Sequence, residues 1–257
     1  MIAIAILFAA AVLPPIYLGK KIYAMDRIEP EPASLLRKLF RLGALACLPA
    51  VILERIAEYA FGVTFQNMNV YLIVEVFAGV ALVEELCKYY FLKRTTWRSP
   101  EFNYRFDGIV YAVMVTLGFA ALENILYVFS YGFGTALVRA LLSIPGHCIF
   151  GIYMGFFYGN AKKHDYQGEP DRSSRQRILA VLVPTLLHGI YDYLAFAMEV
   201  YVDVNGETTL PIFGIFIVYV IVMDVVTIRK VKQFAAEDES ITPGMWNTNP
   251  WESGHRF

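Results

Sequence analysis

The stretch Val80-Ala-Leu-Val-Glu84-Glu85-Leu-Cys-Lys88-Tyr-Tyr-Phe-Leu92 places two adjacent carboxylates and a lysine inside a run that is otherwise hydrophobic enough to cross a membrane. An ionisable side chain at the centre of a membrane helix costs roughly 2.5 to 3.5 kcal/mol, so such a group needs a partner, water or a chemical role. Glu84 and Lys88 share one helix face and can form an ion pair, whereas Glu85 is expected to point toward a different neighbour. We expect the rest of the chain to be organised around this segment.

The composition of the 257-residue chain is that of a polytopic membrane protein, with 57% hydrophobic residues, 15% aromatic residues and a mean hydropathy of +0.49. The net charge of −1 predicts no nucleic-acid partner. Cys47, Cys87 and Cys148 lie within predicted spans and form no CxxC pattern. They are therefore interpreted as small core residues rather than as a disulfide framework or a thiolate zinc site.

Apolar runs long enough to cross about 30 Å of hydrocarbon predict an all-α membrane helix bundle of about seven transmembrane helices. The runs are residues 1–19, 37–54, 70–92, 107–131, 136–160, 178–200 and 210–228. We expect one transmembrane domain over residues 1–232, with a catalytic core at about residues 70–200. A polar and flexible tail is expected over residues 233–257.

Basic residues indicate the orientation of the chain. All lysines and arginines except Arg55, Lys88 and Arg139 lie in the connections after the first, third and fifth spans or in the C-terminal tail. Basic loops stay on the cytoplasmic side of a membrane. The N-terminus is therefore expected outside and the C-terminus in the cytoplasm. The chain is expected to be a multi-pass protein of the cell membrane, with the lipid bilayer around its helices.

Three further spans carry polar side chains at unusual depth. Glu123 and Asn124 are adjacent in the fourth span, His147 lies in the fifth, and His188 and Asp192 lie in the sixth. His188 and Asp192 are four residues apart, so the carboxylate can hold the tautomer and orientation of the imidazole.

Other features of these spans have structural interpretations. Gly151, Gly155 and Gly159 recur at every fourth position, which lets another helix approach closely. Asp107 lies near the start of a span, where a solvated or capping role is expected. Arg139 is interpreted as a structural or interfacial residue.

The depth of the polar residues predicts that they belong together. At about 1.5 Å per residue, Glu84, Glu123, His147 and His188 lie within roughly two helical turns of one another in depth. Each would need separate compensation if it stood alone in the membrane. The sequence therefore predicts one shared site formed by four helices.

The chemistry favoured by this site is peptide hydrolysis. A carboxylate in a low-dielectric cavity can take a proton from water as general base and deliver it to a leaving amine. The two histidines and Asn124 could donate hydrogen bonds to the oxyanion, or Glu and His could bind a divalent metal such as zinc. The metal candidates are Glu84, Glu123, His147 and His188, and a mechanism without metal stays open. The chain lacks HExxH, GxSxG and GxGD motifs.

Ordered motifs on successive spans resemble a known family. They are Glu84-Glu85-x-x-Lys88, Phe106-Asp107-Gly108, Phe119-x-x-x-Glu123-Asn124, His147 and His188-x-x-x-Asp192. This set, over about residues 70–200, is similar to the PrsW family of intramembrane proteases, which is grouped with the CAAX prenyl proteases. The chain departs from the prenyl proteases at Lys88, Glu123 and Asp192, so it resembles PrsW more closely.

The resemblance implies a prokaryotic endopeptidase that cuts a membrane-anchored protein, such as an anti-sigma factor. Glu84 or Glu85 is expected to be the general base. The other expected roles are Glu123, His147 and His188 in the water or metal site, Asn124 and Asp192 as orienting or polarising groups, and Lys88 as the balancing charge. Two other classes stay open: a proton- or ion-coupled transporter or channel, and a non-catalytic scaffold with a protease fold.

Overall fold

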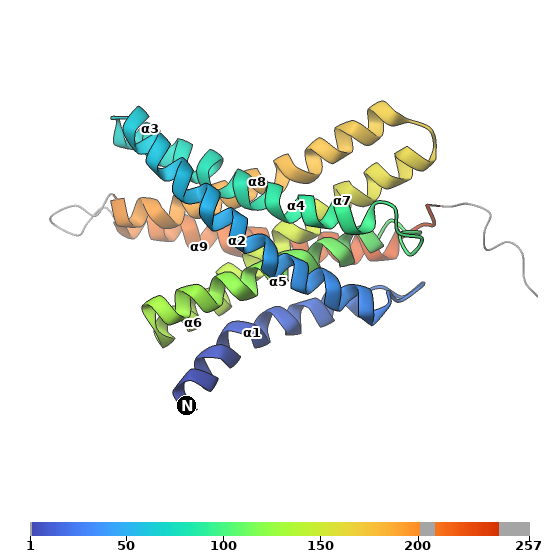
Figure 1. Cartoon of the computed structure of the whole chain (residues 1–257), viewed down its shortest axis with the longest axis horizontal. Helices are drawn as coiled ribbons and strands as arrows, with labels where there is room; N and C mark the ends of the chain where they lie inside the picture. The colour runs from blue at the N-terminus through green and yellow to red at the C-terminus, as the bar shows by residue number, and fades with distance from the viewer. Residues whose placement is uncertain (1, 201–208, 242–257) are drawn as a thin grey trace, which may run out of the picture.

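The computed structural model describes residues 2–200 and 209–241 and is built of helices (Figure 1). The helices are α1 (Ile2–Tyr23), α2 (Ala33–Thr64), α3 (Met68–Val74), the π helix η1 (Glu75–Ala81), α4 (Leu82–Thr96), α5 (Asp107–Tyr131), α6 (Phe133–Leu141), α7 (Ser143–Tyr166), α8 (Pro170–Val200) and α9 (Thr209–Ala236). The prediction of an all-α membrane bundle is confirmed.

Each predicted span falls on helix, although the segments differ in membrane character. The third span corresponds to the continuous run α3–η1–α4, and the fifth begins in α6 and continues in α7. Within the described residues, five helical stretches are long and apolar enough to cross a membrane: α1, α5, α6–α7, α8 and α9. The crossing of α2 and of α3–α4, and the orientation of the chain, stay predictions.

Apolar side chains cover the outer faces of α1 and α9, as expected for contact with lipid. Phe8 and Leu13 on α1, and Ile215, Val218 and Ile221 on α9, are each more than half exposed. Such surfaces are stable only where another apolar phase covers them. The chain is therefore a multi-pass membrane protein.

The helix α5 is the centre of the bundle and packs against α1, α2, α4, α6 and α7. The predicted glycine stripe of α7 faces it. A Cβ added at Gly155 would collide with the backbone of Gly108 and Ile109, and one at Gly159 would collide with the backbone of Arg105. The absence of side chains at these positions lets the two backbones approach closely, which fixes the depth of α7 relative to α5.

Connections at one end of the bundle bring distant segments together (Figure 1). The α1–α2, α4–α5 and α7–α8 connections and the end of α9 all lie at this end. The backbone of Ile241 donates to the carbonyl of Asn103 over 2.7 Å, and Tyr104 pairs with Ser240 in an isolated β bridge.

The C-terminal boundary differs from the sequence-based expectation. α9 continues to Ala236, and Ile241 is buried in the main core. The polar segment expected from residue 233 thus begins with helix and a packed strand-like stretch, because apolar side chains such as Phe234 and Ile241 anchor it. Residues 242–257 lie outside the described residues, and the division into domain and tail stays a prediction.

Candidate active site

Helix α4 contributes Glu84, Glu85 and Lys88, which are all buried, with Glu85 and Lys88 fully so. The Lys88 Nζ lies 2.9 Å from Glu84 Oε2 and 2.8 Å from Glu85 Oε1. The expected pairing of Glu84 with Lys88 is confirmed. The expectation that Glu85 faces a different neighbour is incomplete, because residues three apart on a helix are also neighbours and Lys88 binds both carboxylates.

The π helix η1 immediately precedes this segment. Its wider turn, over Glu75–Ala81, inserts an offset between α3 and α4. Short π segments occur frequently at functional sites. We did not expect it from the sequence, because the hydrophobic run over this stretch has no feature that separates a π turn from an α turn.

Helix α7 brings His147 to the same ammonium group. Its Nδ1 lies 3.3 Å from Lys88 Nζ, and its Nε2 lies 2.9 Å from Glu123 Oε2 of α5. His147 is 3% exposed, so both contacts are shielded from solvent. His147 therefore links the carboxylate of α5 to the charged group of α4.

Helix α8 adds His188 on the opposite side. Its Nδ1 lies 3.1 Å from Glu85 Oε1, and its Nε2 lies 3.2 Å from Asp192 Oδ2. The expected His188–Asp192 pair is confirmed. Phe150 stacks on His188 with 4.7 Å between ring centroids, which fixes the plane of the imidazole.

The two imidazoles are held in the same way. Each has its Nε2 bound to a carboxylate, Glu123 or Asp192, and its Nδ1 directed at α4, where His147 contacts the Lys88 ammonium and His188 contacts the Glu85 carboxylate. Their centroids lie 5.4 Å apart. We call the residues that meet here the membrane cluster: Glu84, Glu85, Lys88, Glu123, His147, His188 and Asp192. The structure thus brings together all the predicted site residues except Asn124.

Asn124 is buried but faces another direction. Its Nδ2 donates to the carbonyl of Ala11 on α1 over 3.4 Å, and its Oδ1 accepts from Arg139 Nε over 3.2 Å. Arg139 in turn pairs with Glu123 Oε2 over 2.8 Å. The interpretation of Arg139 as a merely structural or interfacial residue is therefore incomplete, since its guanidinium binds a residue of the membrane cluster. Arg139 is an isolated cation near the end of α6, and that isolation is the signal in the sequence that could have identified it.

Glu54 of α2 is a further residue that sequence reasoning missed. Its charge interacts with those of Glu84 and Glu123, and its buried Oε1 has no hydrogen-bond partner among the described residues. The sequence places Glu54 at the predicted end of a span, where solvent would be expected. In the structure α2 continues to Thr64, so Glu54 lies well inside the helix.

The donor set fits a divalent metal. Glu84, Glu85 and His147 each offer a ligand atom within 4.8 Å of the others, and all three residues are buried. Glu85 Oε2 is buried and has no hydrogen-bond partner within the described part of the chain. Carboxylate and imidazole ligands, with each imidazole held by a second carboxylate, are typical of zinc sites.

The exposed edge of the membrane cluster is formed by Glu123 and Asp192. Their side chains are 15% and 16% exposed, against 5% or less for Glu84, Glu85 and His188. A separate groove of about 590 Å³ lies between α4 and α8. It is lined by Leu82, Leu86, Tyr89, Lys93, Ser174, Arg177, Ile178, Val181 and Leu182. No residue of the membrane cluster lines that groove.

Buried carboxylates, imidazoles and a lysine that meet between membrane helices are typical of functional sites in membrane proteins, and this set fits the class of intramembrane hydrolases. Residues 31–227 match the PrsW family, described as intramembrane metalloproteases. The chain therefore belongs to the PrsW family and is an intramembrane protease. It acts on a membrane-anchored substrate within the bilayer.

Individual relatives agree with the family match. The chain is 36% identical to Protease PrsW of Oceanobacillus iheyensis over 188 residues, which is 73% of this chain and 82% of the relative. It is 36% identical to Protease PrsW of Geobacillus kaustophilus over 194 residues, covering 75% and 81%. It is 32% identical to Protease PrsW of Bacillus subtilis over 193 residues, covering 75% and 84%. No solved structure matches the chain.

Proposed function

We propose that the membrane cluster is the catalytic centre of this protease and that Glu84 or Glu85 is its general base. The observation that carries the proposal is the convergence of Glu84, Glu85 and His147 within 4.8 Å of one another. Few arrangements other than catalysis or ion binding offset the cost of so many ionisable groups inside a membrane.

The proposed reaction is the attack of an activated water molecule on the scissile peptide bond. The base takes a proton from water, the water oxygen bonds to the carbonyl carbon of the scissile peptide, and the carbonyl becomes an oxyanion. The base then gives the proton to the leaving amine as the C–N bond breaks. Lys88, bound to both carboxylates, balances their charge and keeps them in place.

For the metal, the geometry favours Glu84, Glu85 and His147 as holding residues. His188, another of the sequence-based candidates, contacts Glu85 through its Nδ1. Glu123 was among the sequence-based candidates, but it lies on the far nitrogen of His147, so we propose that it orients the imidazole, as Asp192 orients His188. When bound, a divalent metal such as zinc would act as a Lewis acid toward the scissile carbonyl. Elemental analysis of active protein before and after stringent chelation tests this ligand set.

Cleavage of a single-span substrate by purified protein in detergent tests the catalytic assignment. We expect Glu85→Gln, Glu84→Gln and His188→Ala each to lower the rate by about 10² to 10⁴-fold. Glu75→Gln is the matched control, because Glu75 is another partly buried carboxylate on the same helical run, in η1. Wild-type rates in all three cluster variants would show that the base lies elsewhere and would favour a non-catalytic role for the cluster.

We further propose that the natural substrate is a single-span regulator such as an anti-sigma factor, as the family resemblance implies. Its full-length form should accumulate in cells that carry only the Glu85→Gln variant. Comparison of the membrane proteomes of wild-type and variant cells identifies it. Accumulation only of soluble or multi-span proteins would contradict this substrate class.

A further inference from the structure

A second group of buried carboxylates lies at the other end of α5, outside the membrane cluster. Asp26 and Glu31 come from the α1–α2 connection, and Asp107 is the first residue of α5. They are 6%, 3% and 0% exposed, respectively. Each offers a ligand atom within 4.8 Å of the others. We call Asp26, Glu31 and Asp107 the helix-end cluster.

The helix-end cluster is separate from the proposed catalytic centre. Asp107 and Glu123 lie on the same helix, and at about 1.5 Å per residue their backbones are roughly 24 Å apart. Asp107 was expected in a solvated or capping role. It does accept hydrogen bonds from the backbone of Asn103 and Tyr104, over 3.0 and 2.7 Å, but it is fully buried rather than solvated.

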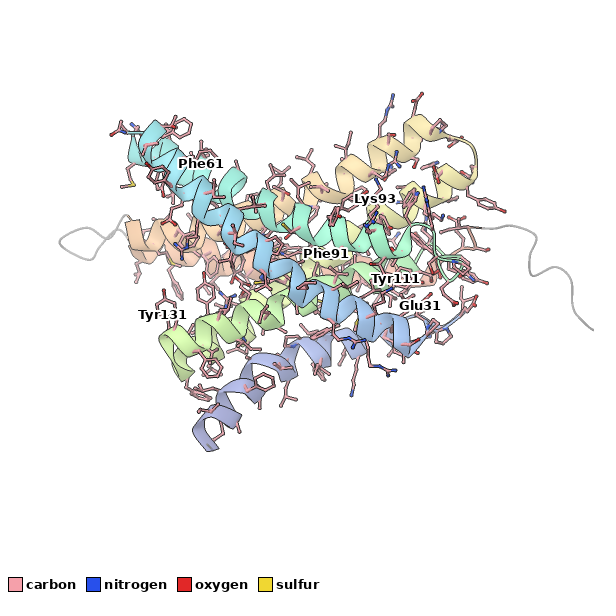
Figure 2. The ribbon with its side chains drawn as sticks, viewed as in Figure 1. Glu31, Phe61, Phe91, Lys93, Tyr111 and Tyr131 are labelled. Atoms are coloured by element: carbon pink, nitrogen blue, oxygen red, sulfur yellow. The ribbon has the colours of Figure 1, made fainter. Side chains whose placement is uncertain are left out.

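Each carboxylate is held in place by neutral donors. Tyr111 donates to Glu31 Oε2 over 2.5 Å, and Figure 2 shows these two side chains next to each other at this end of the bundle. Backbone N–H groups of Glu29 and Glu31 lie close to the Asp26 carboxylate. Neutral groups of this kind orient ligating carboxylates around metals.

Two oxygen atoms of this cluster have no hydrogen-bond partner. Asp26 Oδ2 and Asp107 Oδ1 are buried, and neither finds a donor among the described residues. A buried carboxylate oxygen without a donor costs on the order of 1 to 3 kcal/mol, so such atoms are rare unless a ligand serves them. These oxygens belong to fixed side chains that have further acids around them.

The surrounding charge points to a cation. The charges of Asp238 and Glu29 act on Asp26, and those of Asp26 and Glu101 act on Glu31. The nearby charges that act most strongly on these two carboxylates are thus negative, so a cation would stabilise their ionised form.

We propose that Asp26, Glu31 and Asp107 bind a hard divalent cation, Mg²⁺ or Ca²⁺, that joins the α1–α2 connection to the start of α5. Carboxylate oxygens are the ligands that both ions prefer, and the absence of nitrogen or sulfur donors from this set disfavours zinc. The same end of α5 is joined to the C-terminal segment, because the backbone of Phe106 donates to Asp238 over 2.8 Å. The cation would therefore fix three connections at once.

Terbium luminescence in the detergent-solubilised full chain tests the site. Tb³⁺ replaces Ca²⁺ at oxygen sites, and Tyr111, which contacts Glu31, lies where it can sensitise the emission. We expect saturable emission from the wild type and at least about tenfold weaker affinity in Glu31→Gln and Asp26→Asn, which preserve side-chain size. Displacement by Mg²⁺ or by Ca²⁺ in separate titrations identifies the preferred ion.

Two variants serve as controls. Glu58→Gln removes an exposed acid of α2 outside the cluster and should keep the Tb³⁺ affinity within about twofold of the wild type. Glu84→Gln removes a residue of the membrane cluster and should also keep it, which separates this site from the catalytic proposal. Thermal unfolding without added cation shows whether each variant is folded. If only one of Glu31→Gln and Asp26→Asn is folded, that variant alone suffices for the comparison of Tb³⁺ affinity with the wild type.

Three results would overturn the proposal. The first is that folded wild type gives no saturable Tb³⁺ emission. The second is that a folded cluster variant binds Tb³⁺ with unchanged affinity. The third is that neither Mg²⁺ nor Ca²⁺ displaces Tb³⁺. In each case the carboxylates would be held by protons that they share with one another rather than by a cation.

Discussion

The membrane cluster and the helix-end cluster lie at different depths along α5, and both bury several carboxylates, but they obtain positive charge differently. In the membrane cluster, Lys88 and Arg139 pair directly with Glu84, Glu85 and Glu123. In the helix-end cluster, among the described residues, the carboxylates accept from backbone N–H groups and from Tyr111, and Glu31 and Asp107 contact each other.

The difference indicates what each cluster is suited to do. Built-in cations offset the cost of burying carboxylates inside a membrane, where no counter-ion can reach them from solution. Neutral donors orient carboxylates and leave their charge uncompensated. That arrangement suits a cation that arrives from water at the end of a helix bundle.

Loss of Lys88 is the strongest test of the membrane cluster. In Lys88→Met two buried carboxylates lose their shared counter-charge, so we expect the free energy of unfolding to fall by about 3 to 5 kcal/mol. Unfolding in mixed micelles measures it. Lys93→Met, on the same helix but outside the cluster, is the control and should change stability by less than about 1 kcal/mol. Equal effects of the two substitutions would show that Lys88 does not neutralise the cluster.

The glycine contact between α5 and α7 tests how firmly the two clusters are held on one scaffold. Gly155→Ala would drive a methyl group into the backbone of Gly108 and Ile109, so we expect a loss of about 1 to 3 kcal/mol in stability, with reduced proteolysis. Gly134→Ala is the matched control, because a Cβ there meets no atom of the described residues within 4 Å. Thermal unfolding that is unchanged in Gly155→Ala would contradict the close contact.

Removal of Arg139 separates orientation from chemistry within the membrane cluster. Arg139→Gln leaves Glu123 without its guanidinium partner, and we expect activity to fall roughly tenfold, or about 1.4 kcal/mol in the barrier. The rate of substrate cleavage, compared at equal amounts of folded protein, measures this. Arg55→Gln, which breaks an exposed pair with Glu58, should leave the rate unchanged. Similar rates for Arg139→Gln and the wild type would exclude a positioning role.

The smallest effect is expected at the helix-end cluster. Tyr111→Phe removes the hydroxyl that donates to Glu31, and the net loss of one hydrogen bond is worth about 1 kcal/mol of stability. Proteolysis should be unaffected, because the site lies far from the membrane cluster along α5. Unfolding and cleavage measured on one preparation check both expectations. A loss of activity larger than the loss of stability would indicate that the two clusters are coupled.

The sequence by itself determined the features that follow from the spacing of residues along a helix. Hydrophobic runs of sufficient length defined the helical membrane bundle, and residues three or four apart, such as His188 and Asp192, had to meet because the helix turn brings them together. The glycine spacing of α7 likewise predicted a close helix contact, since it creates a strip without side chains along one face. Depth arguments grouped the polar residues of four helices.

Tertiary structure alone decided how the helices are rotated toward one another. Contacts such as His188 with Glu85 and Glu31 with Tyr111 join residues 103 and 80 positions apart, and no local period specifies them. The same holds for Arg139 beside Glu123 and for Asp107 beside Asp26. The reason is physical: spacing along a helix fixes which face a side chain occupies, whereas the packing of whole helices selects what that face meets.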